Sequence, residues 1–320
     1  MIGYHSVSVL ADAVAKGLPL DKEEVLKAMV SSSTIPYLDG TGEYMEKGYV
    51  ALDHNGSAAS LTLEYAYDDF ALAQMAKALG KTDDYQVLIR RAANYRNVID
   101  PRTGYAQGRH ADGTFLNDAN AFNFARFITE GAPCHYTWYV PQDPYGLMAS
   151  MGGKDKYVAK LDSMFSEQRY WHGNEPCHQV AYMFNYAGEP WKTQRAVRHV
   201  METEYLNEPG GLSGNDDAGQ MSAWYVLAAA GLHPACPGDT RMEITSPVFD
   251  RIELRLDPAY APGGTFTVVA HGNSPSNVYI QRAVLNGREH TASHIDFADI
   301  AAGGTLELYM GDTPNTRWGI

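Results

Sequence analysis

The spacing of apolar residues along this chain changes once, near Pro234, and this change limits the folds that the chain can adopt. Before Pro234, apolar residues recur at steps of three and four, which is typical of helices with one buried face. Between residues 61 and 79 the pattern consists of Leu61, Tyr65, Leu72, Met75 and Leu79. After Pro234, apolar and polar residues alternate in short segments, which is typical of half-buried strands. The sequence therefore predicts a helical part followed by a β part.

The helical part contains predicted helices joined by long loops. They lie near residues 6–16, 22–31, 61–79, 83–92, 154–165, 178–187, 191–204 and 219–231. Gly80 ends the helix that starts at 61, Asp83 caps the next one, and Pro190 precedes the helix at 191 as a first-turn proline. Helices that follow one another in hairpins favour a helical toroid, in which helix pairs close a ring around a pocket. Loops as long as these are usually functional.

The β part contains short predicted strands and two predicted turns. The strands are residues 241–245, 251–256, 265–269, 278–280 and 305–309. Gly263-Gly264 and Asn286-Gly287 are typical of hairpin turns, because these residue types adopt positive φ at little cost. The fold class that we predict is mainly α, with a helical toroid over residues 1–233 and a small antiparallel β region over residues 234–320 packed on it.

Composition excludes several classes of protein. A net charge of −13 argues against nucleic-acid binding, since phosphates need a basic surface. The sequence has no run of about 18 apolar residues, so we expect no membrane span. The segment from Met1 to His5 lacks the basic and apolar regions of a signal peptide. With 320 residues, of which 45% are hydrophobic, the chain can form one large domain or two ordinary ones.

The cysteines do not form a disulfide framework, because Cys134, Cys177 and Cys236 are an odd number. Cys134 and Cys177 each precede a histidine in a loop with candidate site residues. A disulfide between them, a metal-binding pair and two small buried thiols are all compatible with the sequence. Burial is the commonest habit of cysteines outside disulfides.

Two adjacent carboxylates in the segment Gly214–Tyr225 are the strongest indication of chemistry. Asp216 and Asp217 follow a glycine turn and precede an apolar helical run, so a helix would hold the acids in place. Neighbouring side chains of an extended segment point apart, and at most one of the two is therefore the catalytic base. The structural alternative is a helix N-cap, in which an aspartate accepts hydrogen bonds from free N–H groups.

A second polar cluster, His172-Gly173-Asn174-Glu175-Pro176, precedes the two aspartates by about forty residues. Asn174 and Glu175, together with Asn215 and Asp217, carry the amide and carboxylate oxygens that calcium prefers. Their spacing differs from that of an EF-hand loop. An ordinary polar loop is the alternative interpretation of this cluster.

A third acid, Glu130, precedes the aromatic run His135-Tyr136-Thr137-Trp138-Tyr139. Aromatic faces stack on sugar rings, and apolar surroundings raise the pKa of a carboxyl group, as a general acid requires. The same aromatic residues could simply form core. Asp68 falls on the apolar stripe of its helix, where a carboxylate must be paired or face a cavity. A pocket-lining role and a structural hydrogen bond are therefore both open for Asp68.

Six segments together carry a family resemblance. They are Leu63–Phe70, Tyr136–Asp143, Gly173–Pro176, Tyr186–Gln194, Gly214–Tyr225 and Tyr279–Gln281. In their order and residues they resemble glycoside hydrolase family 92, the calcium-dependent exo-α-mannosidases, over nearly the whole chain. The resemblance implies an (α/α)6-type toroid, incomplete at its N-terminus here, and hydrolysis of terminal α-mannose from glycans with inversion. It also implies a calcium ion that holds the sugar hydroxyls.

The resemblance further implies roles for single residues. Glu130 corresponds to the acid that protonates the leaving oxygen. Asp217 corresponds to the base that activates water, with Asp216 as the second candidate. An inverting mechanism needs the two carboxyl groups roughly 6.5–9.5 Å apart, to leave room for the water. The substrate-binding residues that we expect are His172, Asn174, Glu175, Trp138 and Asp68, and the expected calcium ligands are Glu175, Asn174 and Asn215.

Two features depart from the family pattern. Family members are much longer and carry an N-terminal β-sandwich, so we expect this chain to be a fragment, a truncated form or one half of a split protein. Such a chain would pair with a separate β-sandwich domain, or self-associate through an exposed apolar seam. The segment 132–135 reads Ala-Pro-Cys-His where the family commonly has Asn-Ala-Trp-Gln, on the leaving-group side. By resemblance we expect a secreted or periplasmic protein.

Three alternatives stand beside the mannosidase interpretation. The chain could be a truncated domain that binds carbohydrate but is inactive or needs a partner chain. Retention of Glu130, Asp216, Asp217 and Glu175 favours an enzyme, because a binding module needs no acid–base pair. A variant that cleaves mannosyl-phosphate is the second alternative, since a phosphate leaving group needs little protonation. A lyase or epimerase would need a tyrosine or histidine base, and the paired aspartates argue against it.

Overall fold

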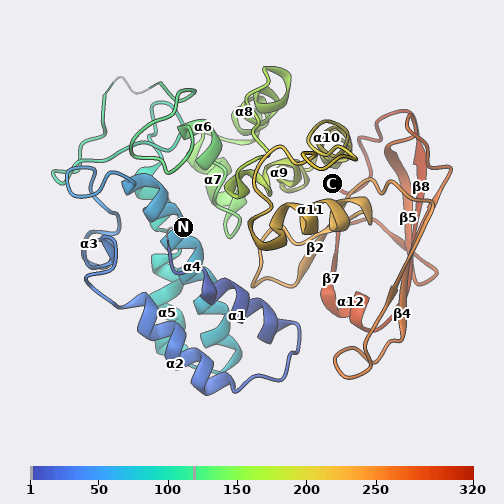
Figure 1. Ribbon diagram of the computed structural model, residues 1–320, viewed down its shortest axis with the longest axis horizontal. Helices are drawn as coiled ribbons and strands as arrows, with labels where there is room; N and C mark the ends of the chain where they lie inside the picture. Colours follow the sequence, from blue (N-terminus) through green and yellow to red (C-terminus); the bar gives the residue numbers. More distant parts are fainter. Residues whose placement is uncertain (1–2, 118–119) are drawn as a thin grey trace. The chain divides into compact units, whose positions relative to one another are not determined.

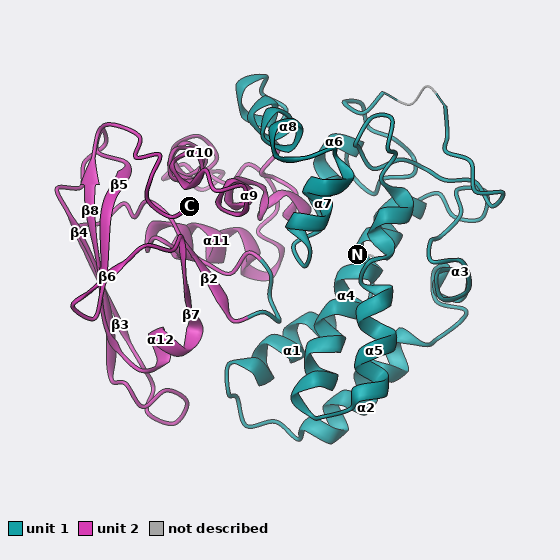
Figure 2. Ribbon diagram, turned by 180° about the vertical axis from the view of Figure 1, so that it is seen from behind, with its two compact units in different colours: residues 1–170, 236–239 teal, residues 171–235, 240–320 magenta. Residues whose placement is uncertain are grey.

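The computed structural model describes residues 3–117 and 120–320, which form two compact units (Figure 2). Unit 1 runs to Tyr170 and includes Cys236–Asp239, whereas unit 2 comprises Trp171–Ala235 and Thr240–Ile320. The helical part does give way to strands at Leu232, close to the predicted position. The boundary between the compact units lies earlier, at residue 170, so the last helices belong to the same unit as the strands.

Unit 1 is built from helices (Figure 1). They are α1 (Ser6–Ala15), α2 (Lys22–Ser33), α3 (Thr41–Lys47), α4 (Ala58–Ala78), α5 (Thr82–Arg91), η1 (Asn94–Val98), α6 (Pro133–Tyr136), α7 (Pro144–Ser150) and α8 (Lys154–Ser166). Helices α1, α2 and α5 pack on α4, which is buried on nearly every side rather than along the single predicted stripe. Within the described residues, no helix of either unit has the length and apolar character needed to cross a membrane.

Unit 2 combines short helices with strands. The helices are η2 (Glu175–Cys177), η3 (Val180–Tyr182), α9 (Met183–Tyr186), α10 (Pro190–Thr203), η4 (Asp217–Gly219), α11 (Gln220–Ala229) and α12 (Phe297–Ala301). The strands are β1 (Leu232–His233), β2 (Arg241–Ile244), β3 (Arg251–Arg255), β4 (Thr265–His271), β5 (Tyr279–Leu285), β6 (Arg288–His290), β7 (His294–Asp296) and β8 (Gly304–Gly311). Pro190 is the first residue of α10, as predicted.

The strands form two sheets, one of which is mixed. Strands β1, β2 and β7 make an antiparallel sheet, and the second sheet has the order β3-β4-β8-β5-β6. Strands β4 and β8 pair in parallel, so the prediction of a purely antiparallel region was wrong for this pair. The reason is topological: the chain leaves the second sheet for β7 and α12 before it returns as β8. Asn286-Gly287 forms the predicted hairpin turn, with φ of 50° and 76°, whereas β3 and β4 are joined by a longer loop.

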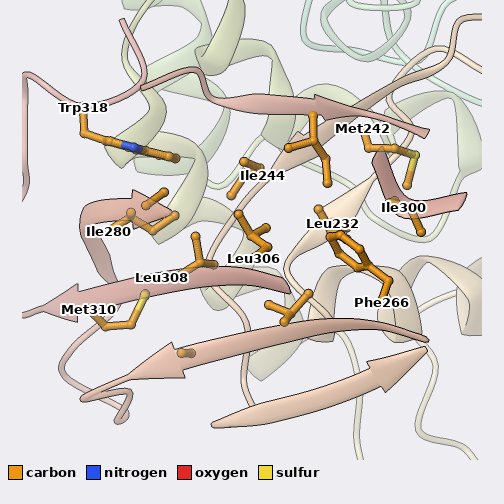
Figure 3. Packing of buried hydrophobic residues seen from close by; sticks show 14 residues of the cluster. Leu232, Met242, Ile244, Phe266, Ile280, Ile300, Leu306, Leu308, Met310 and Trp318 are labelled. Atoms are coloured by element: carbon orange, nitrogen blue, oxygen red, sulfur yellow. The ribbon is translucent and has the colours of Figure 1, made fainter. Parts of the chain in front are cut away.

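The core of unit 2 lies between these sheets (Figure 3). Leu232 and Ile244 from the antiparallel sheet and Phe266, Leu306 and Leu308 from the mixed sheet are each at most 2% exposed. Burying a side chain of this size stabilises a fold by roughly 1.5–3 kcal/mol. Leu232 comes three residues after the end of α11, so this core anchors the helix that follows the paired aspartates.

Candidate active site

Two loops of unit 2 meet backbone to backbone at Gly173 and Gly214. A Cβ atom on Gly214 would lie 2.3 Å from the carbonyl oxygen of Gly173, and one on Gly173 would lie 2.6 Å from that of Ser213. Only glycine permits such a close approach. The two polar clusters that the sequence analysis singled out are therefore brought together within unit 2, although about forty residues separate them in the chain.

The turn that carries the paired aspartates has an unusual backbone. Asp217 and Ala218 have φ of 44° and 57°, and Gly219 has φ of 101°. Left-handed conformations cost non-glycine residues about 1–2 kcal/mol each, and they persist where the surrounding structure imposes them. Helix α11 begins immediately after this turn, at Gln220. Backbone strain of this kind clusters at functional sites, which favours a functional role for Asp217.

The two aspartates have different surroundings. The Asp216 carboxylate accepts a hydrogen bond from the N–H of Ser222 at 2.9 Å, and its carbonyl accepts from Gly219 and Met221. Gly219 stands at the N-cap position of α11, but the Asp216 carboxylate caps the helix in its place by accepting from the first-turn N–H of Ser222, which is the structural alternative raised from the sequence. The side chain of Asp217 is exposed. This difference leaves Asp217 as the carboxylate available for chemistry, although its role as a base stays a prediction.

A buried aromatic cluster lies behind these loops. The Nε2 atom of His172 lies 2.6 Å from the Tyr205 hydroxyl, which donates to the Met221 carbonyl. The His172 ring stacks on His178 at 4.6 Å and meets Trp224 edge-on at 4.4 Å. His172 is fully buried, so its predicted contact with substrate gains no support, and it instead connects the loop 172–176 to α11.

His178 connects the same two loops by hydrogen bonds. Its Nε2 atom donates to the His172 carbonyl at 3.1 Å, and its Nδ1 atom faces the Gln220 amide nitrogen at 3.3 Å. Burial lowers the pKa of His178 to about 4, although the nearby Asp217 carboxylate opposes this shift. Burial likewise lowers the pKa of His172 far below its usual value, with His178 and His233 contributing. Both rings are therefore neutral at physiological pH. Neither His178 nor Tyr205 could be recognised from the local pattern, because their partners lie 6 to 42 residues away.

The third predicted acid, Glu130, belongs to unit 1. Glu130 is exposed and has a positive φ of 54°, whereas Ile128 and Ala132 on either side of it are buried. The N–H of Thr129 donates to the Ser60 hydroxyl at 2.8 Å, which ties this turn to the start of α4. Trp138 is fully buried and meets the Tyr157 ring edge-on at 5.1 Å. The alternative that the aromatic run forms core therefore describes Trp138 better than sugar binding does.

Asp68 lies in a buried polar network of unit 1. One of its oxygens accepts from the Tyr4 N–H at 2.7 Å, and the other lies 2.7 Å from Nδ1 of His5. Nε2 of His5 forms a very short contact with Glu64. The structural interpretation of Asp68 thus gains support over pocket lining, because partners occupy both its oxygens. Glu64 and His5 were missed, although Glu64 stands one helical turn before Asp68 on α4.

The charges in this network are coupled. Burial alone would lower the pKa of His5, but Asp68 and Glu64 outweigh burial and raise it to about 10. Burial raises the pKa values of Asp68 and Glu64, and His5 opposes both shifts. The positive imidazolium of His5 lies between two buried carboxyl groups of α4 and therefore attaches the segment that precedes α1 to this helix.

The expected calcium ligands are oxygen donors on two adjoining loops. Among residues 3–117 and 120–320, no three His, Cys, Asp or Glu side chains gather as a metal-binding group. Glu175 offers one carboxylate, and Asn174 and Asn215 offer amide oxygens from the two loops joined at Gly173 and Gly214. Calcium accepts amide and carboxylate oxygens and completes its shell with water, whereas zinc prefers nitrogen and sulfur. The chemistry of this donor set fits calcium.

The state of the cysteines distinguishes between the three interpretations of Cys134 and Cys177. Cys134, Cys177 and Cys236 are all buried thiols, and no disulfide links any of them. Burial raises the pKa of Cys134 to about 11 and that of Cys236 further. The thiol forms are therefore unreactive at physiological pH. Of the three interpretations of Cys134 and Cys177, small buried thiols match the structure.

Comparisons with known proteins identify the family of this chain. The family described as "Glycosyl hydrolase family 92 catalytic domain" matches residues 1–312. The α-mannosidase BT3965 of Bacteroides thetaiotaomicron is 40% identical, with a TM-score of 0.95 over 99% of this chain and 43% of that one. The inverting mannosidase BT2199 of the same organism is 36% identical, with a TM-score of 0.92 over 100% and 47%. An uncharacterized secreted glycosidase of Arthroderma benhamiae is 28% identical over 99% of this chain and 46% of its own length.

These comparisons also bear on the fold. Similarity over nearly all of this chain, together with its order of helices and then strands, confirms the predicted fold class. The chain spans less than half the length of each of these relatives.

Proposed function

This chain belongs to glycosyl hydrolase family 92, and from this membership we propose that it hydrolyses terminal α-linked mannose of glycans with inversion. The observation that carries the proposal is the contrast between Asp216 and Asp217. Capping of α11 occupies Asp216, while a strained turn presents the carboxylate of Asp217 to solvent. An exposed, rigidly placed carboxylate is what the activation of a water molecule requires.

In this mechanism the two acids act on opposite faces of the sugar. Glu130 protonates the glycosidic oxygen of the leaving group, and Asp217 removes a proton from the water that attacks the anomeric carbon. The bond to the leaving oxygen breaks as the bond to water forms, so the configuration inverts. His178 and Gln220 support the turn of Asp217 from behind, and the neutral His178 ring adds no competing charge.

We also propose calcium as the cofactor of this site. Glu175, Asn174 and Asn215 would hold it, since they supply hard oxygen donors from adjoining loops. When bound, calcium supplies a fixed positive charge to which sugar hydroxyls can bind. The protein residues around this site orient the sugar and move the protons.

The test is an activity screen on α-mannobioses of each linkage, with the anomer of the released mannose followed by proton NMR. We expect β-mannose to appear first, because inversion of an α-linkage yields the β anomer. Release of α-mannose first would contradict the inverting mechanism. Absence of cleavage for every linkage, by a folded chain supplied with calcium, would contradict the proposed activity.

A second candidate, a domain that needs a partner chain for activity, is favoured by one finding. The relatives are more than twice as long as this chain. Activity that appears only when a separate β-sandwich domain is added would support this candidate. Because one relative is a secreted glycosidase, we propose a secreted or periplasmic location for this protein.

A further inference from the structure

The loop that leads to Glu130 exposes two phenylalanine side chains. Phe122 is 43% exposed and Phe124 is 67% exposed. Apolar side chains gathered at one place on a surface often mark a binding site, whereas single ones need no explanation. The two rings have different surroundings, which decide what each can do.

Phe122 belongs to a cation–aromatic cluster. The guanidinium of Arg169 lies 3.4 Å over its ring, and the Tyr105 ring meets it edge-on at 5.6 Å. The ammonium of Lys160, on α8, lies 3.6 Å over the Tyr105 ring. Contacts of this kind contribute about 0.5–2 kcal/mol each. The cluster therefore fixes the loop, and cations occupy a face of Phe122 and of Tyr105.

Phe124 is placed differently. Its ring meets the His135 ring at 6.4 Å and 89°, an edge contact that leaves most of the side chain exposed. His135 is held on both sides, because its Nδ1 accepts from the Ala132 N–H at 3.1 Å and its Nε2 donates to the Arg169 carbonyl at 3.0 Å. Burial lowers the pKa of His135, so the ring is neutral. Phe124 thus stands on a rigid, uncharged support.

The backbone places Phe124 beside Glu130. The N–H of Ala125 donates to the Gly131 carbonyl at 3.3 Å, and the N–H of Cys134 donates to the Ala121 carbonyl at 2.8 Å. The two limbs of the loop therefore run next to each other. Phe124 is the residue before Ala125, and Glu130 is the residue before Gly131, so each stands next to a partner in this hydrogen bond.

We propose that Phe124 is a stacking platform for the first sugar of the leaving group. The proposal rests on the proposed function: a general acid must come within about 3 Å of the oxygen that it protonates. The leaving sugar carries that oxygen, so it must lie next to Glu130, whose segment is hydrogen-bonded to the one that carries Phe124. A hexose presents a patch of C–H groups to one side of its ring, and an exposed aromatic face matches it.

The test compares an α-mannobiose with α-mannosyl fluoride, whose leaving group contains no sugar. In Phe124→Ala, we expect the ratio of kcat/KM for mannobiose to kcat/KM for the fluoride to fall about tenfold, chiefly through KM, since aromatic contacts are worth about 1 kcal/mol or more. Phe124→Tyr should restore the ratio, because it keeps the aromatic face. Phe249→Ala, which removes a phenylalanine that is 56% exposed in unit 2, is the matched control and should keep the wild-type ratio.

The outcomes separate this proposal from the proposed function. An unchanged ratio in Phe124→Ala, in a wild type that cleaves both substrates, would overturn the platform alone. Equal losses on both substrates would also overturn it and would point to a packing role, such as contact with a further domain. A wild type that cleaves neither substrate would overturn the proposed function, and the platform with it.

Discussion

Neighbouring acids in this protein have different tasks because their hydrogen bonds differ. Asp216 caps α11, whereas Asp217 is exposed on the strained turn. Loss of an N-cap costs about 1 kcal/mol, so Asp216→Ala should lower the melting temperature by a few degrees. Asp217→Asn keeps the shape of the side chain and should reduce kcat about a hundred- to ten-thousand-fold with little change in melting temperature. Thermal melts and kinetics of both variants check this. A nearly normal kcat in Asp217→Asn would assign the base to Asp216.

If Glu130 is the general acid, the effect of changing it should depend on the leaving group. Glu130→Gln should slow the cleavage of mannobiose about a hundredfold or more, because the leaving oxygen then departs unprotonated. The loss should shrink for an activated aryl mannoside, whose leaving oxygen is already stable as an anion. The measurement is kcat/KM of wild type and variant on both substrates. Equal losses on the two would remove Glu130 from the acid role.

At the level of elements, the turn before α11 stores strain that can be tested directly. Ala218 has φ of 57° and Gly219 has φ of 101°. Ala218→Gly should raise stability by up to about 1 kcal/mol, since glycine adopts positive φ without steric cost. Gly219→Ala should destabilise the turn and also reduce kcat, because the turn positions Asp217. Denaturant melts of both variants are the measurement, and an unchanged stability of Ala218→Gly would show that the turn is not strained.

The ion pairs of His5 with Asp68 and Glu64 predict that the stability of the fold depends on pH. The folded-state pKa of His5 is raised to about 10 from 6.5, so protonated His5 favours folding. This contribution is complete below about pH 6.5 and is lost as the pH rises through 10. The melting temperature of wild type should therefore fall between these values, and it should fall less in His5→Gln. His54→Gln, at an exposed histidine paired with Glu43, is the control. Equal slopes in wild type and His5→Gln would contradict the assignment.

Elements with a full apolar period were predictable from sequence, and short ones were not. Helices α1, α2, α4, α5, α8, α10 and α11 lie within a few residues of their predicted ranges, because ten or more residues show the period clearly. The sequence analysis missed helix α3, strands β1, β6 and β7, and the division of 178–187 into η3 and α9. These elements are too short for a repeating apolar pattern to be recognised. Asp83 lies in the first turn of α5 instead of capping it, because the helix already starts at Thr82.

The candidate site divides in the same way. Asp217, Asn174 and Glu175 could be proposed as site residues because they stand in short motifs with recognisable chemistry. The long-range contacts behind the turn of Asp217 and around Asp68 could not be predicted, since His178 reaches Gln220 across 42 residues and His5 reaches Glu64 across 59. Such contacts depend on how the helices pack, which the local pattern does not encode.

For the whole molecule, calcium should act on stability as well as on activity. Glu175, Asn174 and Asn215 come from two loops that touch at two glycines, so an ion bound by them would link those loops. A ligand that binds only the folded state stabilises it, by about 2.7 kcal/mol at a hundred times its Kd. Calcium should therefore raise the melting temperature, and a chelator should reverse the rise and abolish mannosidase activity. After chelation, zinc should restore the melting temperature and the activity less than calcium does, because the donors are oxygens.

Matched variants separate this calcium site from general charge effects. The chain carries a net charge of −13, so any divalent cation could stabilise it weakly by screening. Asn215→Ala removes a proposed ligand and should abolish the rise in melting temperature that calcium causes. Asn207→Ala, which changes an exposed asparagine outside the two loops, should keep it. Magnesium at the same concentration reports the screening contribution alone. Full activity in chelator, or an equal response of the two variants to calcium, would exclude a calcium site formed by these loops.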